Sequence, residues 1–283
     1  MKIRLATRKS ALAQIQTNLI INKLRQRFDI SCEKIFVQSY GDRNLDTFDK
    51  INMTGVFTKE LENALLSSNA DAAVHSFKDL PVNIDNRFDI VATPIRDDPR
   101  DVFLTYKDVN FYDLKEGSRI GTSSRRRIIQ LNNIKKGIEF IPIRGNIHTR
   151  INKIKELNLD GIIISAAAIK RLDLWEYNLT YFDCEEVIPA AGQGIICVEI
   201  LKYSEYRQIL TEIDDNIVHQ EADIEKDILK RLGGGCSSPI GVYCKINHNN
   251  IKIIAMIEKD GVIRKYSVNG QITDRDLLID EII

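Results

Sequence analysis

Residues 119–172 read RIGTSSRRRIIQLNNIKKGIEFIPIRGNIHTRINKIKELNLDGIIISAAAIKRL, and this stretch decides the fold. Apolar runs typical of strands cover 119–122, 139–143 and 161–165. Each run is followed by a segment with the apolar spacing of a helix, over 125–131, over 149–157 and up to residue 172. Regular alternation of strand and helix is the pattern of a parallel or mixed α/β sheet.

The same alternation precedes this stretch and resumes after it. We expect strands at 3–6, 34–39, 72–75, 90–95 and 195–200, the last returning the chain to the first domain, and helices at 11–28, capped by Ser10, and 57–66. From about residue 217 the pattern changes to one helix ending at Gly233, three β-like runs and a helix starting at Asp274. The sequence therefore predicts an α/β fold with three domains: residues 1–95 with 195–214, residues 99–190, and a small α+β domain over 217–283.

Charge and composition argue against several classes of protein. The 283 residues carry 40 basic and 40 acidic side chains, whereas nucleic-acid-binding domains are usually basic overall. The apolar runs are far shorter than the roughly 20 residues of a membrane span, and the N-terminus lacks the apolar stretch of a signal peptide. We therefore expect a cytoplasmic protein without nucleic-acid or membrane partners, and nothing in the sequence requires more than a monomer.

The five cysteines are spread along the chain, at Cys32, Cys184, Cys197, Cys236 and Cys244. No pair has C-x-x-C spacing and no histidine stands at ligand spacing, so we expect no metal site. Disulfides are also not expected in the cytosol. Cys236 follows three consecutive glycines, which mark a tightly turning loop where a thiol is poorly buried. We interpret Cys236 as the candidate reactive cysteine and the other four as core residues.

At four junctions a strand ends, a turn follows and a helix starts with small polar residues and arginine: residues 6–10, 121–127, 144–150 and 168–171, of which the first three are the informative ones. Arginine in the first turn of a helix is unfavourable by roughly 0.3–1 kcal/mol, because that end already carries partial positive charge. Repeating the arrangement indicates a bound anion, and the planar guanidinium suits carboxylates. The alternative is that these arginines are solvated or paired with acidic residues. Phosphate and carboxylate are not separated by this argument, although the absence of nucleotide-binding fingerprints disfavours a nucleotide.

A second candidate feature is segment 71–81, whose strand delivers Lys78 and Asp79 at its carboxyl end. Ligand sites of α/β sheets lie at such ends. Asp79 beside cationic groups should stay ionised, and it could stabilise positive charge or pass a proton to a leaving amine. A surface Lys–Asp pair, common and weak, is the simpler alternative.

These segments, together with others in the same order, resemble the porphobilinogen deaminase family, also called hydroxymethylbilane synthase. The matching pieces are ATRKS (6–10), FTKELE (57–62), AVHSFKDLP (73–81), DPRD (98–101), GTSSRRR (121–127), IRGN (143–146) with TR (149–150), KRL (170–172), PAAGQG (189–194) and GGCSSPIG (234–241). The resemblance implies a transferase of tetrapyrrole (haem) biosynthesis. Such an enzyme condenses four porphobilinogen molecules head to tail with loss of ammonia and then releases hydroxymethylbilane by hydrolysis. It also implies two domains like periplasmic binding proteins and a third that carries the cysteine.

The resemblance assigns roles to individual residues. Cys236 matches the cysteine that holds a dipyrromethane cofactor through a thioether, and Asp79 matches the catalytic carboxylate, expected to stabilise positive charge at a pyrrole nitrogen. The positions matched to cofactor and substrate binding are Arg8, Ser10, Lys78, Thr122, Ser123, Ser124, Arg126, Arg127, Arg144, Gly145, Arg150, Arg171 and Gln193, with loop contacts expected at Lys50 and Phe57.

Some positions depart from the family pattern. Thr54 stands in place of a usual loop lysine, Arg125 replaces a usual apolar residue, and His148 and Ala168 replace frequent glycines. The alternative function is a non-catalytic two-domain anion-binding protein, which the fold and the arginines suit but the Gly-Gly-Cys loop and the third domain disfavour. A nucleic-acid binder has only the arginine run at 125–127 in its support.

Overall fold

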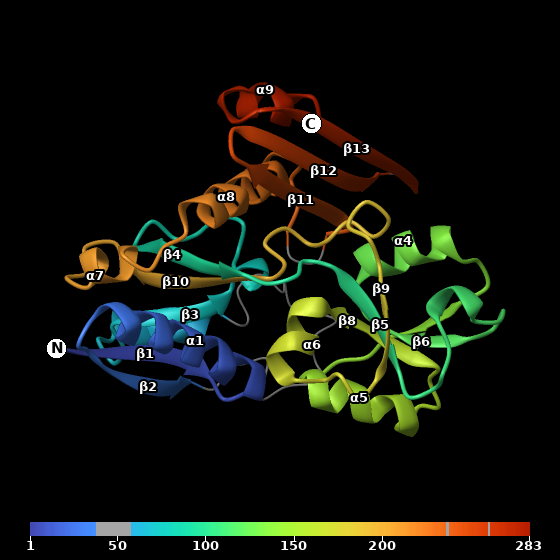
Figure 1. Ribbon diagram of the computed structural model, residues 1–283, viewed down its shortest axis with the longest axis horizontal. Helices are drawn as coiled ribbons and strands as arrows, with labels where there is room; N and C mark the ends of the chain where they lie inside the picture. Colours follow the sequence, from blue (N-terminus) through green and yellow to red (C-terminus); the bar gives the residue numbers. More distant parts are fainter. Residues whose placement is uncertain (38–57, 236–237, 260) are drawn as a thin grey trace.

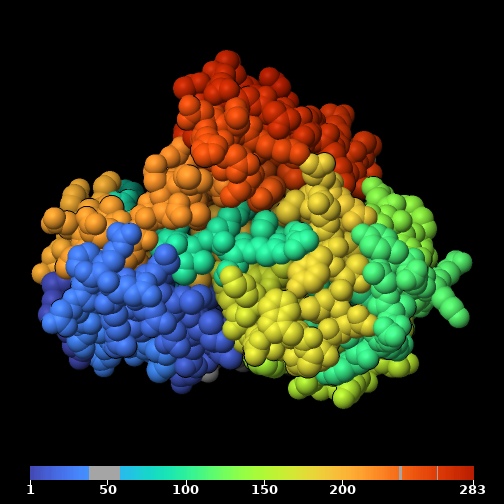
Figure 2. Space-filling model, in the orientation of Figure 1, coloured from blue at the N-terminus to red at the C-terminus, as the bar shows by residue number. Residues whose placement is uncertain are grey.

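The computed structural model describes residues 1–37, 58–235, 238–259 and 261–283. These residues form three lobes (Figures 1 and 2). Two lobes are built on five-stranded mixed sheets, and the third is built on a three-stranded antiparallel sheet.

The first sheet has the strand order β2-β1-β3-β10-β4. Its strands are β1 (Lys2–Arg8), β2 (Ser31–Val37), β3 (Ala72–Ser76), β4 (Phe88–Arg96) and β10 (Ile195–Leu201). β1 runs parallel to β2 and β3, whereas β10 runs antiparallel to both β3 and β4. Helices α1 (Ala11–Arg27) and α7 (Arg207–Thr211) pack on one face of this sheet, and α3 (Lys59–Leu66) packs on the other.

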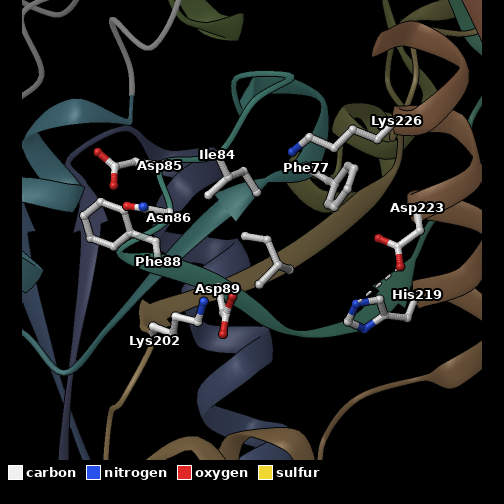
Figure 3. Close-up of a pocket in the computed structure, with 11 residues that line it drawn as sticks. Phe77, Ile84, Asp85, Asn86, Phe88, Asp89, Lys202, His219, Asp223 and Lys226 are labelled. Atoms are coloured by element: carbon white, nitrogen blue, oxygen red, sulfur yellow. Dashed lines mark ion pairs between the residues drawn. The ribbon is translucent and has the colours of Figure 1, made fainter. Parts of the chain in front are cut away.

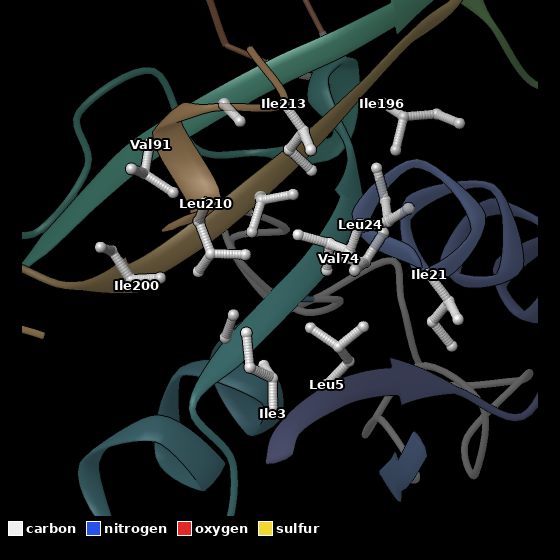
Figure 4. Packing of buried hydrophobic residues seen from close by; sticks show 14 of the residues in the cluster. Ile3, Leu5, Ile21, Leu24, Val74, Val91, Ile196, Ile200, Leu210 and Ile213 are labelled. Atoms are coloured by element: carbon white, nitrogen blue, oxygen red, sulfur yellow. The ribbon is translucent and has the colours of Figure 1, made fainter. Parts of the chain in front are cut away.

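Side chains of β1 enter two separate cores, because successive residues of a strand point to opposite faces. Ile3 and Leu5 pack with Leu24 of α1 and Val74 of β3 (Figure 4). Ala6 instead packs in the core beneath α3. β1 is therefore covered on both faces, and its carboxyl end, like that of the neighbouring β3, is held at a fixed edge of the sheet.

The second sheet repeats this plan with the order β7-β6-β8-β5-β9. Its strands are β5 (Asp101–Thr105), β6 (Arg119–Gly121), β7 (Glu139–Ile141), β8 (Gly161–Ser165) and β9 (Asn178–Tyr181), and its helices are α4 (Arg125–Ile134), α5 (Ile147–Glu156) and α6 (Ala166–Leu172). β6 is parallel to β7 and β8, and β5 is antiparallel to β8 and β9. In each sheet the antiparallel strand comes directly after the chain has crossed from the other sheet, at residues 97–100 before β5 and 182–194 before β10.

The third lobe follows helix α8 (Asn216–Arg231), which Figure 1 shows between the first sheet and the three-stranded sheet. That sheet contains β11 (Ile240–Asn247), β12 (Asn250–Lys259) and β13 (Val262–Gln271), and it is followed by α9 (Arg275–Asp280). One face packs on α8 and α9 through a core that includes Ile228, Val242 and Ile279. The other face meets the second crossing segment, where Ile188 packs against Met256.

The α/β class with a small α+β unit, predicted from the sequence, is confirmed. The strand predicted over 34–39 starts earlier, at Ser31, and its last two residues lie outside the described residues. β5, β9 and α7 were not predicted. β5 was missed because all five of its residues are buried, so it lacks the alternation by which a half-buried strand is recognised. The three-domain division at 1–95 with 195–214, 99–190 and 217–283 stays a prediction.

Across the ranges that the structure describes, no helix combines the length and apolar character needed to cross a membrane.

Candidate active site between the two mixed sheets

The candidate site starts at the carboxyl end of β3, where the chain turns into a short 3₁₀ helix, η2 (Phe77–Asp79). Phe77 is buried and anchors this turn. The second crossing segment passes directly against it, because a Cβ added at Gly192 would lie 2.4 Å from a Phe77 ring carbon and 3.2 Å from the Lys78 amide nitrogen. Gly192 also has φ +74°, so only glycine suits this approach. The two segments together place Lys78 and Asp79 at the junction of the two sheets.

A fully buried carboxylate, Asp101, occupies the start of β5 on the other side of the junction. Its Oδ1 accepts hydrogen bonds from Nη2 of Arg127 at 2.7 Å and from Nε of the same residue at 3.1 Å. Its Oδ2 accepts one from Arg126 Nη2 at 2.8 Å. Although burial opposes ionisation, the two arginines outweigh it and hold the pKa of Asp101 well below its usual range.

Gln193 joins the two halves of the site. Its Nε2 donates to Asp101 Oδ1 at 2.9 Å and to the Pro99 carbonyl at 2.6 Å. Its Oε1 accepts from Lys78 Nζ at 3.3 Å. Burial is the main reason that the pKa of Lys78 falls to about 8, assisted by the positive charges of Arg127 and Arg126 and opposed by Asp79 and Asp101.

Arg150 is the next cation in the same group. Burial and the charge of Arg127 lower its pKa to about 10, while Asp79 acts in the opposite direction. Its Nε donates to the Gly145 carbonyl at 2.9 Å. Gly145 adopts φ +112°, and an added Cβ would lie 2.7 Å from Thr149 Cγ2, so a side chain at 145 would displace the loop that orients this arginine.

The hydroxyl groups expected at the site already form hydrogen bonds to the protein backbone. Ser10 caps α1 by accepting from the Ala13 amide at 3.4 Å, as predicted, and Ser124 caps α4 by accepting from the Arg127 amide at 3.5 Å. Ser123 Oγ donates to the Ile143 carbonyl at 2.8 Å. Thr122 is buried, and its Oγ1 accepts from the Ser124 amide at 3.2 Å. These residues therefore shape the start of α4, where Arg125, Arg126 and Arg127 form the first turn.

The helix start predicted at 168–171 is wrong. α6 begins at Ala166, directly after β8, because three consecutive alanines, which have high helix propensity, follow Ser165. Arg171 therefore lies in the last turn, where its Nε donates to Asp97 Oδ2 at 2.8 Å and its Nη2 to the Gly194 carbonyl at 2.6 Å. These bonds link the two crossing segments. For Arg171 and Arg126, pairing with an acidic residue is what the structure shows.

The remaining predicted residues fall into two groups. Arg8 is the last residue of β1, and Arg144 lies between β7 and α5; both are half-buried. Cys236, Lys50 and Phe57 lie outside the described residues. Beside Cys236, Gly235 and Ser238 are joined by two hydrogen bonds, from the Gly235 amide to Ser238 Oγ at 2.8 Å and from the Ser238 amide to the Gly235 carbonyl at 3.0 Å.

The four cysteines expected in the core divide into two pairs. Cys197 and Cys244 are fully buried, and burial raises the pKa of each thiol. Cys32 and Cys184 are only half-buried, so the core interpretation was too strong for them. Burial still raises the pKa of Cys184 to about 12, which makes a thiolate there unfavourable at neutral pH. In the described part of the chain, no group of histidine, cysteine and acidic residues could hold a metal ion.

Sequence reasoning did not assign roles to Asp97 or Asp101. The signal that could have found them is charge balance, because arginines that enter a core need buried counter-ions, and residues 97–101, DDPRD, supply carboxylates where the chain crosses between the sheets.

A separate cavity of about 350 Å³ lies behind η2, between β4 and α8 (Figure 3). Phe77 forms part of its wall, with Lys226 Nζ 4.9 Å from the centre of the ring. His219, also in the wall, pairs with Asp214 at 2.8 Å. The cavity lining does not include Lys78 or Asp79, so it is not the space in which their chemistry would occur.

Comparison with known proteins identifies this arrangement. The family model described as "Porphobilinogen deaminase, dipyromethane cofactor binding domain" matches residues 3–208, and the one described as "Porphobilinogen deaminase, C-terminal domain" matches residues 219–278. The porphobilinogen deaminase of Clostridium kluyveri is 45% identical over 271 residues, covering 95% of this chain and 93% of the relative. That of Clostridium acetobutylicum is 43% identical over 275 residues, covering 97% and 94%.

Similar solved structures include the VFT2 domain of Bordetella pertussis BvgS, at 14% identity and a TM-score of 0.46, covering 81% of this chain and 92% of that one. The GluR0 ligand-binding core of Nostoc punctiforme covers 82% and 94%, at 11% identity and a TM-score of 0.42. The family models span nearly the whole chain, and the two relatives share more than two fifths of its aligned residues. The chain therefore belongs to the porphobilinogen deaminase family.

Proposed function

We propose that this porphobilinogen deaminase uses Asp79 for its chemistry, Cys236 to attach the dipyrromethane cofactor, and the cations around Asp79 to bind carboxylates. The family establishes the activity, a transferase of tetrapyrrole biosynthesis with a dipyrromethane-binding domain. The assignment of roles to individual residues is our proposal.

The observation that carries the proposal is an excess of positive charge around Asp79. Lys78, Arg126, Arg127 and Arg150 interact electrostatically with one another or with the two carboxylates Asp79 and Asp101. Four cations and two carboxylates leave two positive charges without a partner inside the cluster. Because each pyrrole unit of porphobilinogen carries an acetate and a propionate, that excess matches one unit, and the cluster fits the dipyrromethane for the same reason.

Asp79 is placed to assist the loss of ammonia. Departure of the amine leaves positive charge delocalised over the pyrrole nitrogen and the methylene carbon, which a nearby fixed carboxylate stabilises. Asp79 can also accept and return the proton that moves during carbon–carbon bond formation. When bound, the dipyrromethane supplies the pyrrole carbon to which the first substrate is joined. Repetition gives the chain of four units that is released as hydroxymethylbilane.

The other binding residues are proposed in two classes. Lys78 and Arg150 interact electrostatically with Asp79 and are assigned direct contact with carboxylates, together with Arg8 and Arg144. Supporting roles, which hold those cations in place, are assigned to Ser10, Thr122, Ser123, Ser124, Arg126, Arg127, Gly145, Arg171 and Gln193.

We further propose that the enzyme works as a cytoplasmic monomer. The support is that one chain supplies every described member of the charged cluster. Sedimentation at working concentration tests the oligomeric state: a stable dimer whose disruption abolishes turnover would contradict it.

The test of residue roles combines mass spectrometry with turnover. We expect the protein purified from a porphobilinogen-producing host to carry the added mass of a dipyrromethane on the peptide containing Cys236, to react with Ehrlich's reagent, and to lose both properties in Cys236→Ser. Asp79→Asn should lower kcat by about 10²–10⁴-fold with little change in thermal stability. Asp85→Asn, which affects an exposed carboxylate paired with Arg87, is the control and should keep normal turnover. Unmodified Cys236 in an active enzyme, or normal turnover by Asp79→Asn, would refute the corresponding role.

A further inference from the structure

The buried carboxylate of Asp101 accepts more hydrogen bonds than a single ion pair would supply. Four hydrogen bonds converge on it, three from Arg126 and Arg127 and one from Gln193. Both arginines have further anchors, since Arg126 Nη1 donates to the Ile188 carbonyl at 2.6 Å and Arg127 Nη1 to the Ile163 carbonyl at 2.9 Å. Asp101 therefore lies at the centre of a fixed array rather than at the end of a single salt bridge.

Gln193 extends this array to the other sheet. It is 1% exposed, and its amide contacts two acceptors through Nε2 and one donor through Oε1. Rotating the amide by half a turn would place its oxygen against the Asp101 carboxylate and its NH₂ group against the Lys78 ammonium, so only one orientation satisfies every partner. Gln193 thus connects Lys78 to Asp101 by one hydrogen bond to each, and this connection spans the junction of the two sheets.

We propose that Asp101 is a positioning residue for the reaction, acting through Gln193 and the paired arginines to hold the Lys78 ammonium beside Asp79. The proposal rests on the proposed function, in which Lys78 binds substrate carboxylate next to Asp79. It assigns Asp101 no contact with the substrate, because the carboxylate is fully buried and its oxygens are occupied by protein donors.

The charges around Lys78 give this proposal a measurable consequence. Asp79 and Asp101 favour its protonated form, Arg126 and Arg127 oppose it, and Arg150 lies next to both Asp79 and Arg127. Neutralising Asp101 removes one favourable charge and leaves the opposing arginines without their counter-ion. The pKa of Lys78, about 8 in the native protein, then falls, and the ammonium is lost at lower pH.

Asp101 itself does not titrate in the working range, since its pKa is held far below neutrality. A change in pH dependence after its substitution must therefore arise from another group. A purely structural Asp101 would lower stability or the amount of active enzyme, but it would leave the pH dependence of the remaining activity where it was.

The experiment compares native enzyme with Asp101→Asn, Gln193→Met and the control Asp160→Asn. Asp160 lies in the same α/β lobe, accepts from Lys107 and the Arg119 amide, and is remote from Lys78. Two quantities are measured from pH 6 to 9.5: kcat/KM for porphobilinogen, and the rate at which acetic anhydride labels Lys78, followed by peptide mass spectrometry. Titration of the substrate's own amine is common to all four proteins, so a displacement between them belongs to the enzyme.

We expect the alkaline decline of kcat/KM and the labelling midpoint of Lys78 to move down together by about 1 pH unit in Asp101→Asn. Gln193→Met should move both in the same direction by a smaller amount, because it removes only the hydrogen bond and leaves the buried charge. Asp160→Asn should leave both at native values. If Asp101→Asn does not fold, as judged by circular dichroism, the shifts measured for Gln193→Met decide whether the proposal holds.

Unchanged labelling midpoints in the folded variants would overturn the proposal while leaving the proposed function intact. Native enzyme that folds but neither carries dipyrromethane nor consumes porphobilinogen would instead refute the proposed function. In that case the labelling measurement still reports the coupling between Asp101 and Lys78.

Discussion

Replacing Arg96 with methionine should destabilise the protein strongly, because it removes the cation that pairs with two buried carboxylates, of which only Glu221 has a second cationic partner, Lys245 at 3.2 Å, among the described residues. Arg96 ends β4, with its side chain 6% exposed, and contacts Glu221 at 3.1 Å and Glu225 at 2.8 Å. Both glutamates are fully buried on α8. Glu225 also accepts from the Gly192 amide at 2.6 Å and the Cys244 amide at 2.7 Å. This group therefore connects the end of β4 and the second crossing segment to the third lobe.

The expected cost of Arg96→Met is about 3–5 kcal/mol, the usual range when one partner of a buried ion pair is removed. For a chain of this size that corresponds to a fall of roughly 6–20 °C in the midpoint of the transition that includes the third lobe. Additional substitution of Glu225 by glutamine should recover part of the loss, because the buried charge that lost its arginine partner is then gone. The control is Arg87→Met, which breaks an exposed pair with Asp85 and should cost less than about 1 kcal/mol.

The dependence on pH gives the sharper test. Burial raises the pKa of Glu225, and Arg96 opposes that rise, so the pKa should be higher still in Arg96→Met. A carboxyl group whose folded-state pKa is raised binds more protons in the folded protein, so its unfavourable contribution decreases as the pH falls through that pKa towards the unfolded-state value. The loss in Arg96→Met should therefore be smaller at pH 6 than at pH 8 in thermal unfolding followed by circular dichroism. A loss below about 1 kcal/mol, or one equal at both pH values, would refute this reasoning.

Three further substitutions probe other parts of the site. Gly145→Ala should cost more than about 1 kcal/mol and lower activity, because its φ of +112° disfavours any side chain; native stability and kcat/KM would contradict this. Arg125→Ala should change the free energy of unfolding by less than about 0.5 kcal/mol, because Arg125 is 68% exposed and its pair with Glu258 is 3.6 Å long. A loss above about 1.5 kcal/mol in denaturant titration would instead show that Arg125 stabilises the contact between the domains. Arg171→Met should destabilise by more than about 2 kcal/mol by leaving Asp97 without its buried partner, whereas a neutral result in calorimetry would mean that Lys170 alone suffices.

Elements with a strong local pattern could be predicted from the sequence. β8 was predicted at its observed bounds, and α1 was predicted within one residue, because an apolar run and a helix with a serine N-cap are recognised from consecutive residues. β10 was also predicted to return to the first sheet, and it pairs there with β3 and β4. β5 was missed because its five buried residues are recognisable as a strand only from their pairing with β8 and β9, which are distant in sequence.

The candidate site was predictable in its residue types but not in its partners. The arginines of 125–127 and the Lys78–Asp79 pair were selected from the sequence, yet nothing local shows that Asp101 would serve two arginines and Gln193 at once. Such pairing depends on where the chain crosses between sheets. The partner of Arg171 could not be predicted for the same reason, since Asp97 lies 74 residues away.

The arginines that stabilise the fold can be distinguished from those available to a ligand by the partners that their side chains already have. Arg126 and Arg171 are buried, and each donates to an aspartate and to a backbone carbonyl, so a substrate carboxylate would have to displace bonds that the fold already makes. Arg150 donates through Nε to a carbonyl and, within the described residues, faces one carboxylate and one like charge. A like charge nearby lowers the pKa of an unliganded guanidinium, and a bound carboxylate relieves that repulsion. The proximity of the like charges of Arg127 and Arg150 is therefore a feature expected of a site that binds an anion.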